Sequence, residues 1–334
     1  AARVERRSGN ILARPSKPKP SSPDAVLQSP RVCDARGACN RPAAPLDMIP
    51  QRTPDMPKYR LLAIDIDGTL VNSRDELTPR VRAALTRAGR SGIRIVLASG
   101  RRYSRVLPLV EPLALDVPLV TASGALVKDP QDHRTLFRAE FAEEVLRGTI
   151  AAVDRAGFDP LLCGDTFLQG FDFYAPTTLR REEAREYVQR NRGDGRLCPV
   201  MLRHPPSEVF LVFTLGTQEQ MLSLQAQLHE QLSGQIATHV LRTPRYTSYL
   251  CEIAPAGVSK WAAVRRLAEQ WAIADAEICA VGDDVNDIAM IRAAGLGVAM
   301  GNAQPEVKAA ADRIAPSHDE DGLAEVVRWL LEER

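Results

Sequence analysis

The sequence predicts an α/β fold: a parallel sheet covered by helices on both faces, with a second α/β domain inserted into it. Strand and helix patterns alternate from about residue 58 onward, which is typical of such sheets. Two apolar strands far apart in the chain, at 61–64 and 278–281, both end in acidic residues. The alternation restarts at about Phe141 and returns to the first unit at about Ser259, so one domain interrupts the other.

The first elements follow from caps and chain breaks. The apolar run at 61–64 fits a strand buried on both faces. Thr78 and Pro79 supply an N-cap and a first-turn proline, and apolar residues follow at helical spacing until Gly92. Next we expect a strand at 93–98, a helix at 103–113, a strand at 118–121 and a hairpin that turns at 129–132.

The inserted unit is expected to contain helices at 143–156, 178–190 and 218–232, and strands near 161, at 209–215, near 240 and near 250. A helix at 259–271 returns to the core. The predicted domains are therefore an N-terminal extension at 1–57, a core at 58–138 and 254–334, and an inserted α/β domain at 139–253. The active site should lie at the interface of core and insert.

Two carboxylates stand at the end of the first strand. Side chains two apart on a strand point the same way, so Asp65 and Asp67 should both project from its carboxyl end. Open α/β sheets bind ligands there. Two acids this close repel unless a cation lies between them, and oxygen ligands suit a hard cation. The alternative is an ordinary turn, because Asp and Gly are common turn residues.

Further polar residues extend this group. Asp283 and Asp287 follow the strand at 278–281 and can serve as metal ligands, while residues 99–101 close the strand at 93–98. Lys260 begins the returning helix. A carboxylate nucleophile, a second acid, a hydroxyl, an amine and a distal acidic pair are the groups that phosphoryl transfer requires.

These motifs resemble those of the haloacid dehalogenase superfamily of phosphatases, and more narrowly its Cof-type sugar-phosphatase branch. The resemblance runs from about Tyr59 to the C-terminus and implies a Rossmann-like core with a cap inserted between the second and third motifs. The matching stretches, in order, are Asp65-Ile66-Asp67-Gly68-Thr69, Ser99-Gly100-Arg101, Gly257-Val258-Ser259-Lys260, Gly282 to Asp287, and Ala299-Met300-Gly301-Asn302-Ala303.

The resemblance also implies roles for single residues. Asp65 would be the nucleophile that forms an aspartyl-phosphate, and Asp67 the general acid/base. Magnesium would be bound by Asp65, the backbone carbonyl of Asp67, Asp283 and Asp287. The expected substrate contacts are Thr69, Ser99, Gly100, Arg101, Lys260 and Asn286. The expected substrate is a small phosphorylated metabolite such as a sugar phosphate.

The chain departs from the family pattern at three places, none of them a catalytic acid. Trp261 and Ser123 replace a common Gly and Asn, and His318 stands where Asn is frequent. These departures concern which substrate is recognised and leave the expected chemistry unchanged. The cap should choose the leaving group, and its candidate residues are Arg203, His204, Arg245 and Tyr246, although each is more simply interpreted as a solvated loop residue.

Two other functions remain open. A phosphomutase uses the same aspartyl-phosphate, but only a short stretch, 71–95, separates the first two motifs here, and the large cap disfavours it. A non-catalytic phospho-ligand sensor would be favoured by a missing Asp67 or Lys260, and both are present. Phosphate release from a generic aryl phosphate with Mg²⁺ distinguishes an enzyme from a sensor.

Composition argues against some partners. The net charge is +1, of which residues 1–57 contribute +5, so the catalytic part carries no basic excess for nucleic acid. No apolar run reaches the ~18 residues of a membrane span. The six cysteines form no disulfide framework, so we expect a cytoplasmic protein with reduced thiols. Residues 1–57 hold ten of 24 prolines and are expected to be a disordered, dispensable extension.

Overall fold

The protein is described by a computed structural model that covers residues 57–113, 117–242 and 247–333. The predicted N-terminal extension lies outside the described residues, apart from Pro57. Two of the predicted cap candidates, Arg245 and Tyr246, also lie outside them. No helix within these ranges is long and apolar enough to span a membrane.

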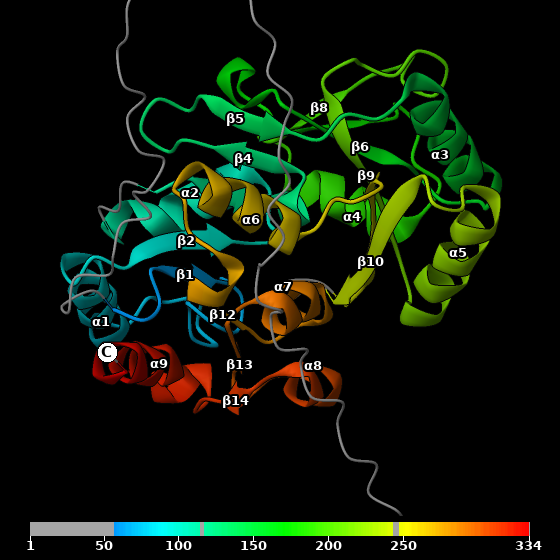
Figure 1. Cartoon of the computed structure of the whole chain (residues 1–334). Coiled ribbons are helices and arrows are strands. Elements are labelled where there is room, and N and C mark those ends of the chain that lie inside the picture. Colours follow the sequence, from blue (N-terminus) through cyan, green and yellow to red (C-terminus); the bar gives the residue numbers. More distant parts are fainter. Residues whose placement is uncertain (1–56, 114–116, 243–246, 334) are drawn as a thin grey trace, which may run out of the picture. The chain divides into compact units, whose positions relative to one another are not determined.

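Within the described residues the core contains an eight-stranded sheet, in the order β14-β13-β12-β1-β2-β3-β4-β5 (Figure 1). The pairs from β14 to β3 are parallel, and β4 and β5 add an antiparallel hairpin at one edge. Their bounds are β1 Leu61–Ile64, β2 Arg94–Ala98, β3 Leu119–Thr121, β4 Leu126–Lys128, β5 Thr135–Arg138, β12 Ile278–Gly282, β13 Leu296–Ala299 and β14 Arg313–Ile314.

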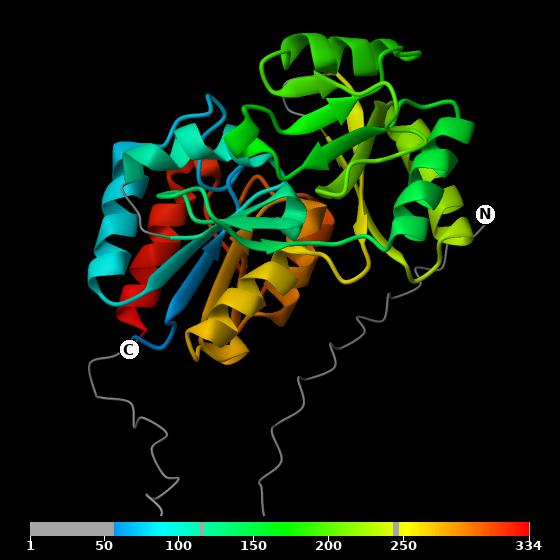
Figure 2. The same cartoon turned by 90° about the horizontal axis from the view of Figure 1, so that it is seen from above.

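Helices cover both faces of this sheet, as the sequence predicts. Figure 2 shows α1 and α9 on one face and α6 and α7 on the other. Alternate residues of β1 divide accordingly: Leu62 and Ile64 belong to the apolar cluster with α1 and α9, and Leu61 and Ala63 to the cluster with α6. The helices are α1 Pro79–Arg90, α2 Tyr103–Val110, α6 Lys260–Gln270, α7 Ile288–Ala293, α8 Pro305–Ala310 and α9 Gly322–Glu332.

The cap predicted for the first core helix is present. The Thr78 side chain accepts a hydrogen bond from the Val81 backbone N–H at 3.2 Å, and Pro79 opens α1. One predicted start is wrong: the helix expected from residue 178 is α4, Glu182–Arg190. The Asp159 carboxylate accepts hydrogen bonds from the backbone N–H groups of Arg180 and Arg181, which holds those residues in an extended segment before the helix.

A second sheet is inserted between β5 and α6, in the order β10-β11-β9-β6-β7-β8 within the described residues. Helices α3 and α5 pack together on one of its faces, where Leu146 and Leu224 join the apolar cluster (Figure 1). The elements are α3 Glu143–Arg155, β6 Leu161–Gly164, β7 Phe173–Ala175, α4, β8 Gly195–Leu197, β9 Val209–Gly216, α5 Gln218–Gln231, β10 Ile236–Arg242 and β11 Tyr249–Pro255. We call this inserted unit the cap.

Buried polar contacts join the core to the cap. The Lys128 ammonium lies 2.7 Å from the Asp165 carboxylate. The Arg102 guanidinium donates to Asp172 at 3.3 Å and to Asn191 at 2.8 Å, and it lies over the Phe173 ring. Because each buried charge has a partner of opposite sign, these contacts can be buried without leaving an isolated charge.

Candidate active site

The predicted site residues lie at the carboxyl ends of neighbouring parallel strands. Asp65 follows β1, Ser99 follows β2 and Asp283 follows β12, and β1 pairs with both other strands. The Asp65 backbone N–H continues this ladder by donating to the Val281 carbonyl at 3.0 Å. The parallel register therefore brings together residues that are about 200 positions apart in the chain.

Three carboxylates form one cluster. Asp65, Asp283 and Asp287 each offer an oxygen, and these oxygens lie within 4.8 Å of one another. Asp65 is only 3% exposed, and Asp287 is fully buried. Asp287 is held in place because its Oδ2 accepts from the backbone N–H groups of Asp283 and Asp284 at 3.0 and 3.1 Å. The set can bind a divalent cation, which prefers carboxylate oxygens.

Lys260 lies within this acidic cluster. Its Nζ is 2.5 Å from Asp65 Oδ1 and 2.7 Å from Asp287 Oδ1, and the side chain is buried. Burial lowers the pKa of Lys260, but the charges of Asp287 and Asp65 outweigh that effect and raise it. Ser259 caps the helix that presents this lysine, accepting from the Ala262 N–H at 3.1 Å.

The cluster holds more negative charge than one lysine neutralises. Burial, and after it the charge of Asp287, raises the pKa of Asp65 well above its ordinary value. The same two causes raise the pKa of Asp283 to about 8. Ionised carboxylates in this arrangement are unfavourable without a further cation. The residues present therefore fit the divalent metal that the sequence resemblance implies.

Gly68 allows two loops to meet at the cluster. Its φ is +74°, and a Cβ there would lie 2.2 Å from Asp283 Oδ2, so no side chain fits. Asn302 donates to the Gly68 carbonyl at 2.9 Å and to Asp283 Oδ2 at 3.3 Å. Thr69 donates to Asp283 Oδ1 at 3.3 Å. Asn302 thus ties the first and fourth motifs together, a role that the sequence did not indicate.

Asp67 lies beside this cluster, where the Arg101 side chain binds it. The Arg101 Nε donates to both Asp67 oxygens, at 3.0 and 2.8 Å, and its Nη2 donates to Asp75 at 2.7 Å. The Ser99 hydroxyl accepts from the Arg101 backbone N–H at 3.0 Å. The guanidinium, expected to contact substrate, therefore fixes the position of the Asp67 carboxylate, whose side chain remains 34% exposed.

One residue at the site comes from the cap, and the sequence did not single it out. Glu252 of β11 accepts a hydrogen bond from the Ser123 hydroxyl at 2.5 Å, and Ser123 in turn accepts from Asn286 Nδ2 at 3.4 Å. Glu252 is 4% exposed. An acid inside an otherwise apolar strand, 249–255, was the available signal.

The buried Glu252 predicts a pH-dependent stability. Burial raises its pKa from 4.5 to about 7, with Asp284 adding to this and Ser123 and Lys260 opposing it. The folded state therefore holds this proton more tightly than the unfolded state, and the resulting stability, present below about pH 4.5, is lost as the pH rises through about 7. A shift of this size corresponds to roughly 3 kcal/mol.

Glu252→Gln keeps the shape and cannot ionise. Its free energy of unfolding relative to wild type should therefore rise by up to about 3 kcal/mol between about pH 5 and about pH 8. Urea denaturation of both proteins at the two pH values measures this. The other buried acids are the same in both proteins, so their contributions cancel in the difference between the two free energies of unfolding. If that difference is equal at both pH values, the raised pKa does not belong to Glu252.

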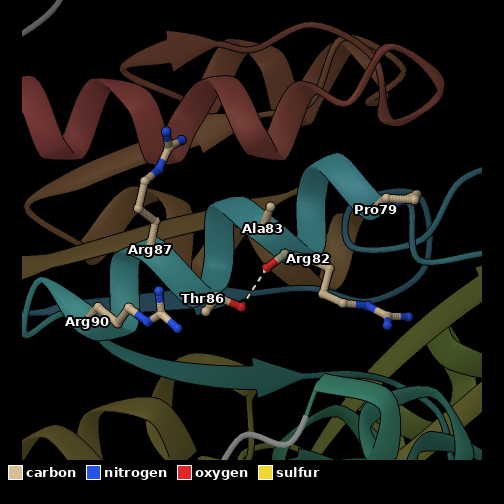
Figure 3. A pocket seen from close by; sticks show the side chains of 6 residues that line it. All are labelled: Pro79, Arg82, Ala83, Thr86, Arg87 and Arg90. Carbon is tan, nitrogen blue, oxygen red and sulfur yellow. Dashed lines mark hydrogen bonds between the residues drawn. The ribbon is translucent and has the colours of Figure 1, made fainter.

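Other surface features lie apart from these acids. Arg203 and His204 are exposed in a turn after β8, where the described contacts do not link them to the acids. A hollow on the exposed side of α1 is lined by Pro79, Arg82, Ala83, Thr86, Arg87 and Arg90 (Figure 3). No predicted site residue lines it.

Comparison with known proteins agrees with this geometry. Residues 62–327 match the family model of haloacid dehalogenase-like hydrolases. Phosphatase YwpJ of Bacillus subtilis is 28% identical over 81% of this chain and 100% of its own length. The B. subtilis 5-amino-6-(5-phospho-D-ribitylamino)uracil phosphatase YcsE is 27% identical over 81% and 96%.

A solved structure gives the same result. A haloacid dehalogenase-like hydrolase from Bacteroides thetaiotaomicron is 29% identical, has a TM-score of 0.66, and covers 81% of this chain and 99% of its own. The match spans both the core sheet and the inserted cap sheet. The chain therefore belongs to the haloacid dehalogenase-like hydrolases, as a phosphatase of the Cof-like branch with an inserted cap.

Proposed function

We propose that the protein is a Mg²⁺-dependent phosphatase that hydrolyses small phosphorylated metabolites, sugar and polyol phosphates among them. One observation carries this proposal: a buried lysine lies between Asp65 and Asp287, within a carboxylate cluster at the strand ends. Such a set combines a nucleophile with charges that neutralise a phosphate. The ribityl phosphate in the name of YcsE supports a polyol phosphate as one substrate class.

The chemistry proceeds in two steps. Asp65 attacks phosphorus, an Asp65–phosphate bond forms as the ester P–O bond breaks, and Asp67 gives its proton to the leaving alkoxide. A water then attacks the phosphorus of the aspartyl-phosphate while Asp67 takes a proton from it. Inorganic phosphate leaves and the Asp65 carboxylate is restored. Lys260 and Ser99 hold the phosphate oxygens through both steps.

The metal would be held by Asp65, Asp283 and Asp287, and by the backbone carbonyl of Asp67. When bound, Mg²⁺ supplies positive charge that lets an anionic nucleophile approach an anionic phosphate. Arg101 holds the Asp67 carboxylate, so that its proton is delivered from one position. We further propose that Thr69, Gly100 and Asn286 contribute to the substrate pocket.

The cap is proposed to span 139–253, between core segments at 58–138 and 254–334. A cap that closes over the substrate excludes bulk water from the aspartyl-phosphate and then reopens for release. Phosphate release measured on the purified protein with a generic aryl phosphate and Mg²⁺ tests the proposed function. Absence of any release contradicts it, and transfer of phosphate back to a sugar phosphate in place of release would indicate a mutase.

Removal of the metal is expected to stop turnover. Excess chelator should abolish phosphate release, and added Mg²⁺ should restore it, because without the cation burial and the neighbouring acids keep Asp65 from the ionised form that attacks phosphorus. Asp283→Asn should weaken Mg²⁺ binding at least about tenfold, since it removes one carboxylate ligand. Calorimetric titration with Mg²⁺ measures this directly.

Asp132→Asn is the matched control, because Asp132 is 60% exposed on the β4–β5 turn. It should bind Mg²⁺ as wild type does. The alternative function of the acids is to cap the short helix at 285–287, where Asp284 already accepts from the Val285 N–H at 2.7 Å. Full turnover in excess chelator would favour that structural function alone.

A further inference from the structure

A buried polar cluster joins the cap to the loop that follows β3. Its members are Asn286, Ser123 and Glu252, linked by the two hydrogen bonds described above. Asn286 is 6% exposed, and Glu252 only 4%. Ser123 and its neighbour Ala122 both have positive φ, at 53° and 49°. Left-handed backbone at non-glycine residues is unfavourable and collects at functional sites, and here it holds the Ser123 hydroxyl toward Glu252.

Two acceptor atoms of this cluster have no donor within the described part of the chain. Asn286 Oδ1 is buried without a hydrogen bond. Glu252 accepts from Ser123 through Oε2, and no described residue donates to its Oε1. A carboxylate and an amide oxygen can each accept two hydrogen bonds or more. Asn286 Oδ1 is the buried one of the two, and a buried acceptor left unpaired costs free energy, so a ligand that brings a donor is favoured at this position.

His239 adds a third polar group on the same face of the cap sheet. It is the register partner of Glu252 in the antiparallel β10–β11 ladder, so the two side chains stand next to each other. Among the described residues it makes no hydrogen bond to a side chain or the backbone through its ring. Burial, and then the charge of Lys260, lowers its pKa to about 4. The imidazole is therefore neutral near pH 7, with one donor and one acceptor.

This cluster lies next to residues 99–101, which follow β2 and include Ser99, a proposed phosphate contact. A Cβ added at Gly100 would lie 3.4 Å from both Asn286 Nδ2 and Ser123 Oγ, and 3.6 Å from Leu241. Leu241 is two residues from His239 and so shares its face of β10. A leaving group attached to a phosphate at Ser99 and Gly100 would therefore meet these polar side chains first.

We propose that Glu252 and His239 of the cap, with Ser123 and Asn286 of the core, form a subsite that binds a hydroxyl of the leaving group. The selected substrates are phosphate monoesters that carry a hydroxyl on the carbon next to the ester carbon. A hydroxyl both donates and accepts, which matches two unpaired acceptors beside a neutral imidazole. An ammonium group fits less well, because it has no lone pair with which to accept a hydrogen bond from the imidazole. The inference rests on the proposed phosphatase function.

The test compares two alkyl phosphates of equal chain length. Glycerol 1-phosphate has the vicinal hydroxyl, and propyl phosphate lacks it. At about pH 8, where the Glu252 carboxyl is ionised, wild type should favour glycerol 1-phosphate in kcat/KM, and Glu252→Gln should lower this ratio about 10-fold, because a neutral amide oxygen is a weaker acceptor than a carboxylate. Glu230→Gln, at an exposed position on α5, is the matched control and should leave the ratio unchanged.

The outcomes separate this inference from the proposed function. If wild type releases no phosphate even from an aryl phosphate, the proposed function fails. If it hydrolyses the aryl phosphate but treats the two alkyl esters equally, or if Glu252→Gln keeps the wild-type ratio, the subsite is wrong. A preference for 2-aminoethyl phosphate over both esters also overturns it. Should Glu252→Gln fail to give a cooperative thermal transition, His239→Phe makes the same test and should lower the same ratio.

Discussion

Asp65→Asn is expected to reduce phosphate release from every substrate by on the order of 10⁴-fold or more, the usual result of removing a covalent nucleophile. A carboxamide has nearly the shape of the carboxylate but does not attack phosphorus. The substitution should also leave no phosphorylated protein detectable by mass spectrometry after mixing with substrate. Burst kinetics with an aryl phosphate would show the same loss.

The fold should survive this substitution. Burial and the neighbouring acid raise the pKa of Asp65, so its ionised form is unfavourable in the metal-free protein. Replacing it with a neutral group removes that cost, and Lys260 keeps its 2.7 Å contact with Asp287. The metal-free variant should therefore melt at or above the wild-type temperature while being inactive, a trade-off common at active sites. An inactive variant that also unfolds early would point to a structural role for Asp65.

The sequence was sufficient to predict that the acids lie close together, and the reason is local. Each acid directly follows an apolar strand, and parallel strands of one sheet place such ends together. Lys260 was predictable in the same way, because Ser259 before it is an N-cap and fixes where α6 begins. These features depend on residues within a few positions of one another, together with one rule of sheet topology.

The remaining features depend on contacts between distant segments. The direction of the Arg101 guanidinium is set by Asp67 and Asp75, which the sequence places 34 and 26 positions away. The late start of α4 follows from Asp159, whose carboxylate accepts hydrogen bonds from the backbone N–H groups of residues 180 and 181. No periodicity encodes such a competition between a side chain and a helix.

The entry of Glu252 into the site is the clearest case of this kind. Its position requires the register of β10 on β11, and also the way the cap sheet meets the loop after β3. The three-residue strands β7 and β8 are too short to show a period of two. In this chain the sequence places the acids after the strands of the core sheet, but it does not give the face that the cap presents to them.

Asp67→Asn is expected to slow turnover by about 10²–10⁴-fold, the usual contribution of general acid–base catalysis, while leaving Asp65 able to attack. Asn keeps the shape and the backbone carbonyl but cannot exchange a proton. The rate of the first step should therefore fall most for substrates whose leaving alkoxide must be protonated. It should fall least for nitrophenyl phosphate, because nitrophenolate leaves without a proton.

The second step needs Asp67 whatever the leaving group, because a water must be deprotonated to hydrolyse the aspartyl-phosphate. With nitrophenyl phosphate, a phosphorylated Asp65 should therefore accumulate in Asp67→Asn and be visible by mass spectrometry. Asp75→Asn is the matched control: it removes the other acid on Arg101, and loss of a part-exposed ion pair costs only about 0.2–1 kcal/mol. If Asp67→Asn hydrolysed sugar phosphates at the wild-type rate, Asp67 would serve only to anchor Arg101, and the acid–base step would belong to another group.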